Sequence, residues 1–177
     1  TTIDDGSPAV TLFSPQDAPR PYFGQFGWIP IGELKVPDSK TVWQADHPSV
    51  QPSRPLTLSW DNGQGVRFIQ VIEIDDNFMM TVTQRVENSS TQAISTHPYG
   101  RIARTHTPDT LGFYILHEGP LAVFNDTLKE VDYDDLQEGP ADATKSTGGW
   151  IGITDKYWLA ALIPDQKEPY TGTFRYS

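Results

Sequence analysis

Apolar and polar residues alternate in short runs along much of the chain, a pattern typical of β-strands with one buried face. Two clear runs are Leu56 to Trp60 and Val66 to Ile74, and the Asp61-Asn62-Gly63 segment between them is a strong hairpin signal. A third run, Phe78 to Val86, follows the turn-forming residues Asp75-Asp76-Asn77. This part of the sequence therefore predicts three consecutive antiparallel strands.

The rest of the chain carries the same kind of signal. Further strands are predicted over Val10 to Phe13, Ala93 to Arg104, Gly119 to Phe124 and Thr171 to Tyr176. No stretch of eleven or more residues shows helical periodicity with caps. Many short strands at close spacing predict an all-β fold of mostly antiparallel strands, a sandwich or a barrel-like structure. Without an internal repeat or a linker, we expect a single domain over residues 1–177.

The densest apolar run lies between Gly148 and Pro164. Its pattern predicts strands over Trp150 to Thr154 and Tyr157 to Ile163, with Asp155-Lys156 at the turn. In the second strand both alternating sets of side chains are apolar, which predicts a central strand covered on both faces. The glycines before and within the first strand are expected where another backbone or a ring approaches closely. A core hairpin is the preferred interpretation, and an exposed aromatic platform for a ligand is the alternative.

One substitution separates these two interpretations. If the Trp150 ring is fully buried, Trp150→Ala should cost about 3–5 kcal/mol of stability. An unchanged melting midpoint would favour the exposed platform.

Composition narrows the function classes. The formal net charge of the 177 residues is −10, and Lys and Arg are scattered singly, which argues against binding to nucleic acid or anionic lipid. The absence of cysteine excludes thiolate catalysis, Cys-based zinc sites and disulfides. The longest uninterrupted apolar run is far shorter than the roughly 20 residues that span a bilayer.

Candidate acid–base and aromatic residues are few. The histidines are His47, His97, His106 and His117, with Glu118 beside the last. Acid–base work on a sugar needs the two groups on opposite sides of it, and adjacent strand residues point to opposite faces, which argues against His117 with Glu118. A ligand cleft could be lined by Trp28, Trp43 or Trp60, although packing in a core is the commoner use of tryptophan.

Metal and cofactor signals are weaker still. An acidic cluster is formed by Asp132, Asp134, Asp135 and Glu138. It could attract Ca²⁺, but it lacks the glycine and terminal glutamate spacing of a calcium loop, so we interpret it as a solvated acidic face. The histidines lack the spacing of a metal site, and neither a phosphate-binding loop nor a nucleophile elbow is present. The sequence predicts no catalytic residue, no metal and no cofactor.

Four segments together resemble one protein family. They are Ser7 to Pro15, Pro21 to Trp28, Leu116 to Asn125 followed by Leu128 to Glu130, and the hairpin GGWIGITDKYWLAALIPD from Gly148 to Asp165. The chain resembles the periplasmic domain of YidC, the bacterial membrane protein insertase family, in its alphaproteobacterial form. The resemblance implies a β-supersandwich related to galactose mutarotase. It also implies that the chain is an incomplete fragment of that domain, without the membrane anchor and the membrane core.

The resemblance also implies a role. It points to a non-catalytic accessory domain on the periplasmic side of the bacterial inner membrane. The implied partners are the translocon subunits SecD and SecF, with SecYEG as a further candidate, and emerging membrane-protein segments. It assigns no ligand- or partner-binding residues. The alternative is a mutarotase-like carbohydrate-binding domain or epimerase.

Overall fold

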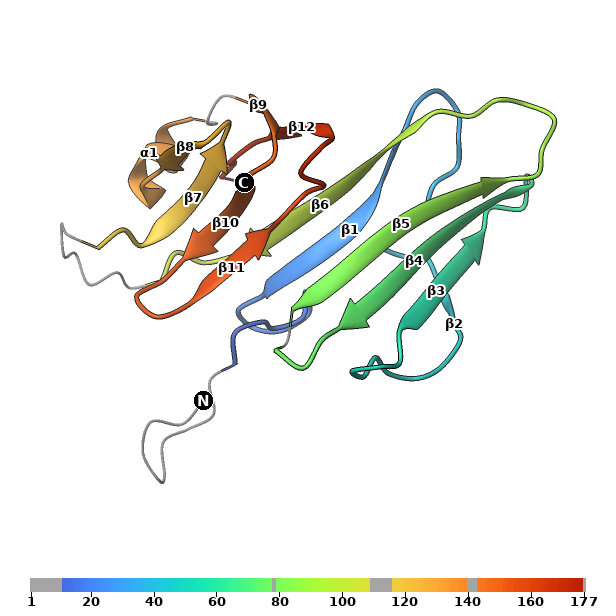
Figure 1. The fold of residues 1–177 in the computed structure, drawn as a ribbon, viewed down its shortest axis with the longest axis horizontal. Helices are drawn as coiled ribbons and strands as arrows, with labels where there is room; N and C mark the ends of the chain where they lie inside the picture. Colours follow the sequence, from blue (N-terminus) through green and yellow to red (C-terminus); the bar gives the residue numbers. More distant parts are fainter. Residues whose placement is uncertain (1–10, 78, 109–115, 140–142, 177) are drawn as a thin grey trace. The chain divides into compact units, whose positions relative to one another are not determined.

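The computed structural model describes residues 11–77, 79–108, 116–139 and 143–176 (Figure 1). These residues form twelve strands and a helix of six residues, so the predicted all-β class is confirmed. The strand pairs of the two four-stranded sheets are all antiparallel. No described helix has the length and apolar character needed to cross a membrane. A relationship to galactose mutarotase stays a prediction.

The chain divides into two compact units. Unit 1 comprises the residues up to Gln25 and those from Arg101 onward, and unit 2 spans Phe26–Gly100. The divisions fall within β1 (Tyr22–Pro30) and β6 (Thr96–Arg104), which pair with each other. A single domain over 1–177 stays a prediction.

Unit 2 contains a four-stranded sheet in the order β2-β3-β4-β5 (Figure 1). The strands are β2 (Gln44–Ala45), β3 (Leu56–Asp61), β4 (Val66–Ile74) and β5 (Met80–Asn88). The predicted run of three consecutive strands is confirmed. Only Phe78, at the start of the third predicted run, lies outside the described residues.

Local hydrogen bonds explain why the chain turns where the sequence predicted. The buried Asn62 side chain accepts hydrogen bonds from the backbone N–H groups of Gln64 (2.8 Å) and Val66 (3.2 Å), and Gly63 has φ +75°. After β4, Asp75 Oδ1 accepts bonds from two later backbone N–H groups, at 2.8 and 2.9 Å. Asx and glycine chemistry of this kind is what tight turns require.

The core of unit 2 lies on one face of this sheet. Trp28, Val66 and Phe68 are buried together, and the Trp28 and Phe68 rings meet edge to face at a centroid distance of 5.1 Å. Two side-chain amides of the sheet fix β1 over this core. Gln70 Nε2 donates to the Phe26 carbonyl (3.1 Å), and Gln84 Nε2 donates to the Gly27 carbonyl (2.7 Å).

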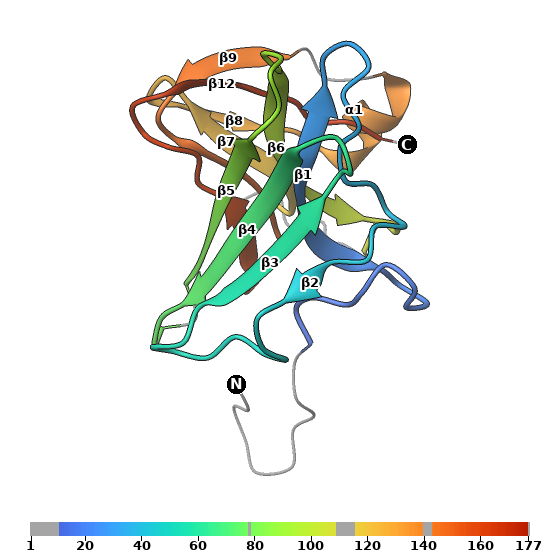
Figure 2. The same cartoon turned by 90° about the vertical axis from the view of Figure 1, so that its right-hand side faces the viewer.

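Unit 1 contains a second four-stranded sheet, in the order β11-β10-β7-β8. Its strands are β7 (Gly119–Phe124), β8 (Thr127–Glu130), β10 (Trp150–Thr154) and β11 (Leu159–Leu162). A two-stranded sheet pairs β9 (Thr144–Thr147) with β12 (Pro169–Gly172), which lie side by side in Figure 2. The helix α1 (Tyr133–Glu138) follows β8.

The core of unit 1 is aromatic at its centre. It consists of Ala122, Phe124, Leu136 and Phe174, with the Phe124 and Phe174 ring centroids 6.4 Å apart. Tyr170 packs against this cluster and lies 6.3 Å from Phe124. A Cβ at Gly172 would lie 2.5 Å from the Phe124 ring, which explains a glycine at the end of β12.

Several predicted strands differ from the structure at their ends. The segment Thr11 to Phe13 lies outside any strand, and Val10 lies outside the described residues. The strand predicted from Ala93 begins at Thr96, and the one predicted over Thr171 to Tyr176 is β12, ending at Gly172. The prediction of Gly119 to Phe124 is confirmed. Strands β1, β2, β8 and β9 were missed because their alternation is short or interrupted by glycine and polar residues.

Candidate functional site

The candidate acid–base residues are not gathered into one site. His47 follows β2 with Nε2 3.5 Å from Asp46 Oδ1, His97 is an exposed residue of β6, and His106 follows β6. Among the described residues, no group of three or more His, Asp or Glu side chains is arranged to hold a metal ion.

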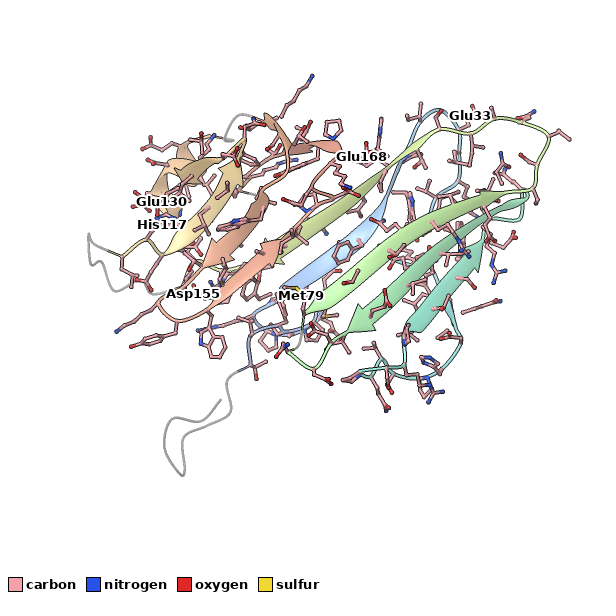
Figure 3. All side chains as sticks on the ribbon, in the orientation of Figure 1. Glu33, Met79, His117, Glu130, Asp155 and Glu168 are labelled. Carbon is pink, nitrogen blue, oxygen red and sulfur yellow. The ribbon has the colours of Figure 1, made fainter. Side chains whose placement is uncertain are left out.

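His117 lies just before β7 and contacts residues close to it in the sequence (Figure 3). Its Nε2 is 3.0 Å from the Pro120 carbonyl oxygen, and its Nδ1 is 3.7 Å from Asp132 Oδ1. Glu118 is half-buried beside it, also ahead of the strand. These contacts tie the start of β7 to the segment before α1, which is a structural role.

The three candidate platform tryptophans belong to the core of unit 2. Trp28 is buried, and its ring lies 6.3 Å from that of Trp43. The Trp60 ring packs on that of Phe68 at a centroid distance of 5.9 Å, and the Lys35 ammonium lies over the Trp60 ring, 5.6 Å from its centroid. Ring faces occupied in this way favour core packing over a sugar platform.

The acidic cluster lies at the short helix. Asp134 and Asp135 occupy the first turn of α1 and Asp132 precedes it, where carboxylates are stabilised by the helix dipole. Glu138 is the last helical residue and is exposed. This arrangement agrees with a solvated acidic face.

A charged and aromatic cluster in unit 1 was not predicted. Arg104, at the end of β6, donates from Nη1 to Asp155 Oδ1 at 2.7 Å, and its guanidinium lies 4.8 Å from the centroid of the Tyr22 ring. The side chains of this ion pair are only 12% and 25% exposed. Figure 3 shows Asp155 at the turn between β10 and β11, so the ion pair fixes the tip of that hairpin to β6.

Burial sets the electrostatics of this cluster. Burial raises the pKa of Tyr22 to about 12 and also raises the pKa of the Tyr133 hydroxyl, although Arg104 opposes both shifts. Burial opposes the charge on Arg104, but Asp155 outweighs it and raises the pKa of the guanidinium. Arg104 therefore stays charged, and both tyrosines stay neutral at physiological pH. The cluster therefore has a structural role, and neither Arg104 nor the two tyrosines are prepared to transfer a proton.

The glycines of the apolar hairpin serve close backbone packing. Gly149 has φ +83°, and a Cβ there would overlap the Val123 carbonyl. A Cβ at Gly152 would overlap the Ala160 carbonyl, because β10 and β11 approach closely. Gln166 closes the hairpin: its amide accepts from Gly149 N–H and donates to Gly149 O, both at 3.0 Å. The predicted hairpin is confirmed, but its second strand is β11, Leu159–Leu162, so it is shorter than predicted and the turn runs from Asp155 to Trp158.

The prediction that the second strand is central and covered on both faces is wrong. β11 is the end strand of its sheet, with β10 as its one neighbour in the order. Four residues at alternating positions are exposed here: Leu159 (49%) and Ala161 in β11, and Tyr157 (74%) and Ile163 (58%) just before and just after it. We call these four residues the β11 stripe. The Lys156 ammonium lies 5.0 Å from the centroid of the Tyr157 ring. The apolar pattern was recognised correctly, but it does not reveal whether a layer covers the strand.

The β11 stripe continues across the sheet. The register places Ala161 beside Gly152, Gly152 beside Leu121, Trp150 beside Val123, and Val123 beside Leu128, all on the same face. Leu128 is 56% exposed, and Leu121, Val123 and Trp150 are half-buried. The exposed Glu130 lies beside Leu121 on the same face, so the surface is mostly apolar with one carboxylate at its β8 edge. We call this surface, with the β11 stripe, the open face. The opposite face carries Ala122, Phe124 and Ile151 into the core.

Comparison with known proteins identifies the family. The family described as the YidC periplasmic domain matches residues 1–177. The chain belongs to this family. Two similar proteins are both named "Membrane protein insertase YidC". The one from Methylorubrum extorquens (strain PA1) is 44% identical over 98% of this chain and 30% of its own length. The one from Rickettsia bellii (strain OSU 85-389) is 38% identical over 99% of this chain and 32% of its own length. The relative from Granulibacter bethesdensis is 40% identical over 98% of the chain.

The family assignment confirms the resemblance described above. The chain spans about 30% of the length of the curated relatives it matches. No solved structure matches it.

Proposed function

We propose that this chain is a non-catalytic, periplasmic part of an inner-membrane protein insertase and that it supplies a binding surface. The partners proposed are the translocon subunits SecD and SecF, with SecYEG as a further candidate, and emerging segments of membrane proteins. The name of the relatives, membrane protein insertase, supports clients of this kind.

The open face is the observation that carries this proposal. Leu128, Leu159 and Ile163 are each about half exposed or more, on a sheet whose other face already packs on a core. A contiguous exposed apolar surface of this kind marks an interaction site more often than a surface that stays in water. A binding role requires such a surface and does not require a reactive group.

Site-specific photo-crosslinking in the full-length membrane protein tests the proposal. A photoreactive residue is placed at Ala161 or Leu128 on the open face, and at Thr83 on β5 as a matched exposed strand position. The two open-face positions should capture translocon subunits or nascent membrane proteins, and Thr83 should capture neither. Capture of unrelated periplasmic proteins alone, or equal yields from Thr83, would contradict the proposal.

The carbohydrate alternative has its own cheap test. Trp28, Trp43 and Trp60 pack in or against the core of unit 2, so monosaccharides should leave the tryptophan fluorescence unchanged. A saturable change in that fluorescence would support a mutarotase-like ligand site instead.

A further inference from the structure

We infer that Asn62 is a latent modification site, whose side-chain amide is converted to aspartate or isoaspartate when the turn between β3 and β4 opens. The folded turn holds the reacting groups in hydrogen bonds and so suppresses the reaction. This inference is independent of the proposed function and concerns unit 2 alone.

The sequence supplies the reacting groups. Asn62 is followed by Gly63, and this is the one Asn-Gly pair in the chain. Glycine favours attack by its own nitrogen on the preceding side chain, because it has no side chain of its own to hinder that nitrogen and reaches backbone conformations that other residues avoid.

The reaction consumes one water molecule and releases ammonia. The Gly63 nitrogen gives up its proton to a base in the solvent and attacks Cγ of Asn62. The new N–Cγ bond closes a succinimide ring while the Cγ–Nδ2 bond breaks, and Nδ2 takes up a proton and leaves as ammonia. Water then opens the ring at one of its two carbonyl carbons, which gives aspartate or isoaspartate.

The folded turn occupies the attacking nitrogen. Gly63 N–H donates to Asp61 Oδ1 at 2.7 Å. Attack requires this N–H to lose its proton, and the resulting anion would lie against the Asp61 carboxylate. Repulsion between two negative charges at that separation opposes the step. Asp61 therefore keeps the nucleophile inactive while the turn is formed.

The folded turn also holds the amide that is attacked. Asn62 is 5% exposed, and its Nδ2 donates to the Lys35 carbonyl at 3.2 Å. Loss of Nδ2 as ammonia requires this bond to break, and hydrolysis requires water to enter a buried position. The N–H groups of Gln64 and Val66 polarise the Asn62 carbonyl, which by itself favours attack at Cγ. Because both the nucleophile and the leaving group are held, the turn must open before the reaction proceeds.

Conversion of Asn62 would loosen a loop that packs on the core of unit 2. This loop, residues 31–43, joins β1 to β2 and is tied to the turn by the bond from Asn62 Nδ2 to the Lys35 carbonyl. An ionised aspartate has no hydrogen to donate to that carbonyl, and isoaspartate adds a methylene to the backbone of the turn. Three side chains of the loop that pack against the core are Leu34, Val36 and Trp43.

Peptide mapping by mass spectrometry tests the site. Full-length protein in lipid nanodiscs is incubated at mildly alkaline pH in parallel with a synthetic peptide of residues 58–67, which carries the same dipeptide without the fold. The peptide should form aspartate and isoaspartate at Asn62 roughly tenfold faster or more, because only the open turn reacts. Equal rates would overturn the protection by the fold, and a peptide that forms no product would overturn the site itself.

Variants of Asp61 locate the protection. Asp61→Ala removes the acceptor of the Gly63 N–H and should raise the rate in the folded protein several-fold. Asp61→Ser keeps a side-chain oxygen that can accept from this N–H and should restore most of the protection. The control is Glu87→Ala, which removes the carboxylate on the other side of Arg67 in the register and should leave the rate unchanged. If Asp61→Ala reacts no faster than Glu87→Ala, Asp61 does not guard the site.

Hydrogen exchange measures the consequence for the loop. Asn62→Asp reproduces one product of the reaction and should speed exchange of the amides in residues 31–43 roughly tenfold. Asn77→Asp adds the same charge at an exposed turn residue of unit 2 and should leave these amides unchanged. Equal exchange in the two variants would show that the loop does not depend on the Asn62 amide, which overturns this consequence.

Discussion

The two four-stranded sheets of this chain divide their apolar residues differently. In unit 2, one face of the sheet carries Val66 and Phe68 into a core. Its other face is mostly polar and charged, with Arg67 between Asp61 and Glu87 in the register, although Ile69 and Ser59 on that face are buried. In unit 1, one face carries Ala122 and Phe124 into a core, while the open face is also mostly apolar, with Glu130 at its β8 edge.

This difference indicates what each sheet is built for. An antiparallel sheet with one polar face is stable with that face exposed to water. A sheet that is apolar on both faces leaves a cost in water unless something covers the second face. The sheet of unit 2 is therefore explained by folding alone, whereas the open face of unit 1 agrees with the binding role proposed above.

The largest effect is expected in the core of unit 2. Phe68 is fully buried, so Phe68→Ala should lower the free energy of unfolding by about 3–5 kcal/mol. Chemical denaturation measures this loss. Thr83→Ala, on the exposed polar face of the same sheet, should stay within about 0.5 kcal/mol of the unsubstituted chain. A comparable loss at both positions would mean that the two faces do not differ as described.

A smaller but still large effect is expected where the sheet of unit 1 is most tightly packed. Gly149→Ala combines φ +83° with an overlap of the new Cβ on the Val123 carbonyl, and should cost about 2 kcal/mol or more. Gly63→Ala has a similar φ of +75° but open space around the Cβ, and should cost about 1 kcal/mol. Thermal unfolding compares the two, and equal losses would argue against close packing at Gly149.

The ion pair of unit 1 should contribute more to stability than the ion pair of unit 2. Asp155→Asn leaves the half-buried Arg104 without its charged partner and should cost about 2 kcal/mol. The Arg85–Glu87 pair in unit 2 is nearly as short, at 2.9 Å, but its side chains are 62% and 49% exposed. Glu87→Gln should therefore cost no more than about 0.5 kcal/mol. A denaturation series that ranks the two variants the other way would refute the structural role of Asp155.

The smallest effect is a pH dependence in unit 1. Burial, with Arg104 and Arg20, lowers the pKa of His106 in the folded chain, although Asp155 opposes this shift. The unfolded state therefore binds more protons, so this contribution to stability is full above the ordinary histidine pKa of about 6.5 and is lost as the pH falls below it. His106→Gln should flatten the fall in melting midpoint between neutral and mildly acidic pH. An unchanged slope would show that His106 does not contribute to the pH dependence of stability.

Much of the fold could be predicted from the sequence, because its signals are local. The alternation in Val66 to Ile74, the turn chemistry of Asn62 and Asp75, and the hairpin after Gly149 depend on neighbouring residues alone. The exposure of β11 depends on what lies beside it, which a run of apolar residues does not reveal. The same limit applies to Trp150, which is half-buried, so the cost of Trp150→Ala should fall below the 3–5 kcal/mol estimated for full burial.

The Arg104–Asp155 ion pair could not be predicted for a related reason. Arg104 ends β6 and Asp155 occupies a turn, and residues 51 positions apart carry no local signal that they meet. Turn aspartates usually bond to the local backbone, so a turn position at Asp155 does not predict a distant ion pair. Its role in fixing the hairpin that bears the β11 stripe appears only when the tertiary contacts are known.

The most direct test of the central claim compares β11 with β5 by hydrogen exchange in the full-length protein. Both are end strands of their sheets, but β11 bears the open face and β5 the polar one. When a stalled nascent membrane protein engages the insertase, the account predicts slower exchange at Leu159 to Leu162 and no change along Met80 to Asn88. If β11 is unaffected, or if both strands respond equally, the open face is not the binding surface.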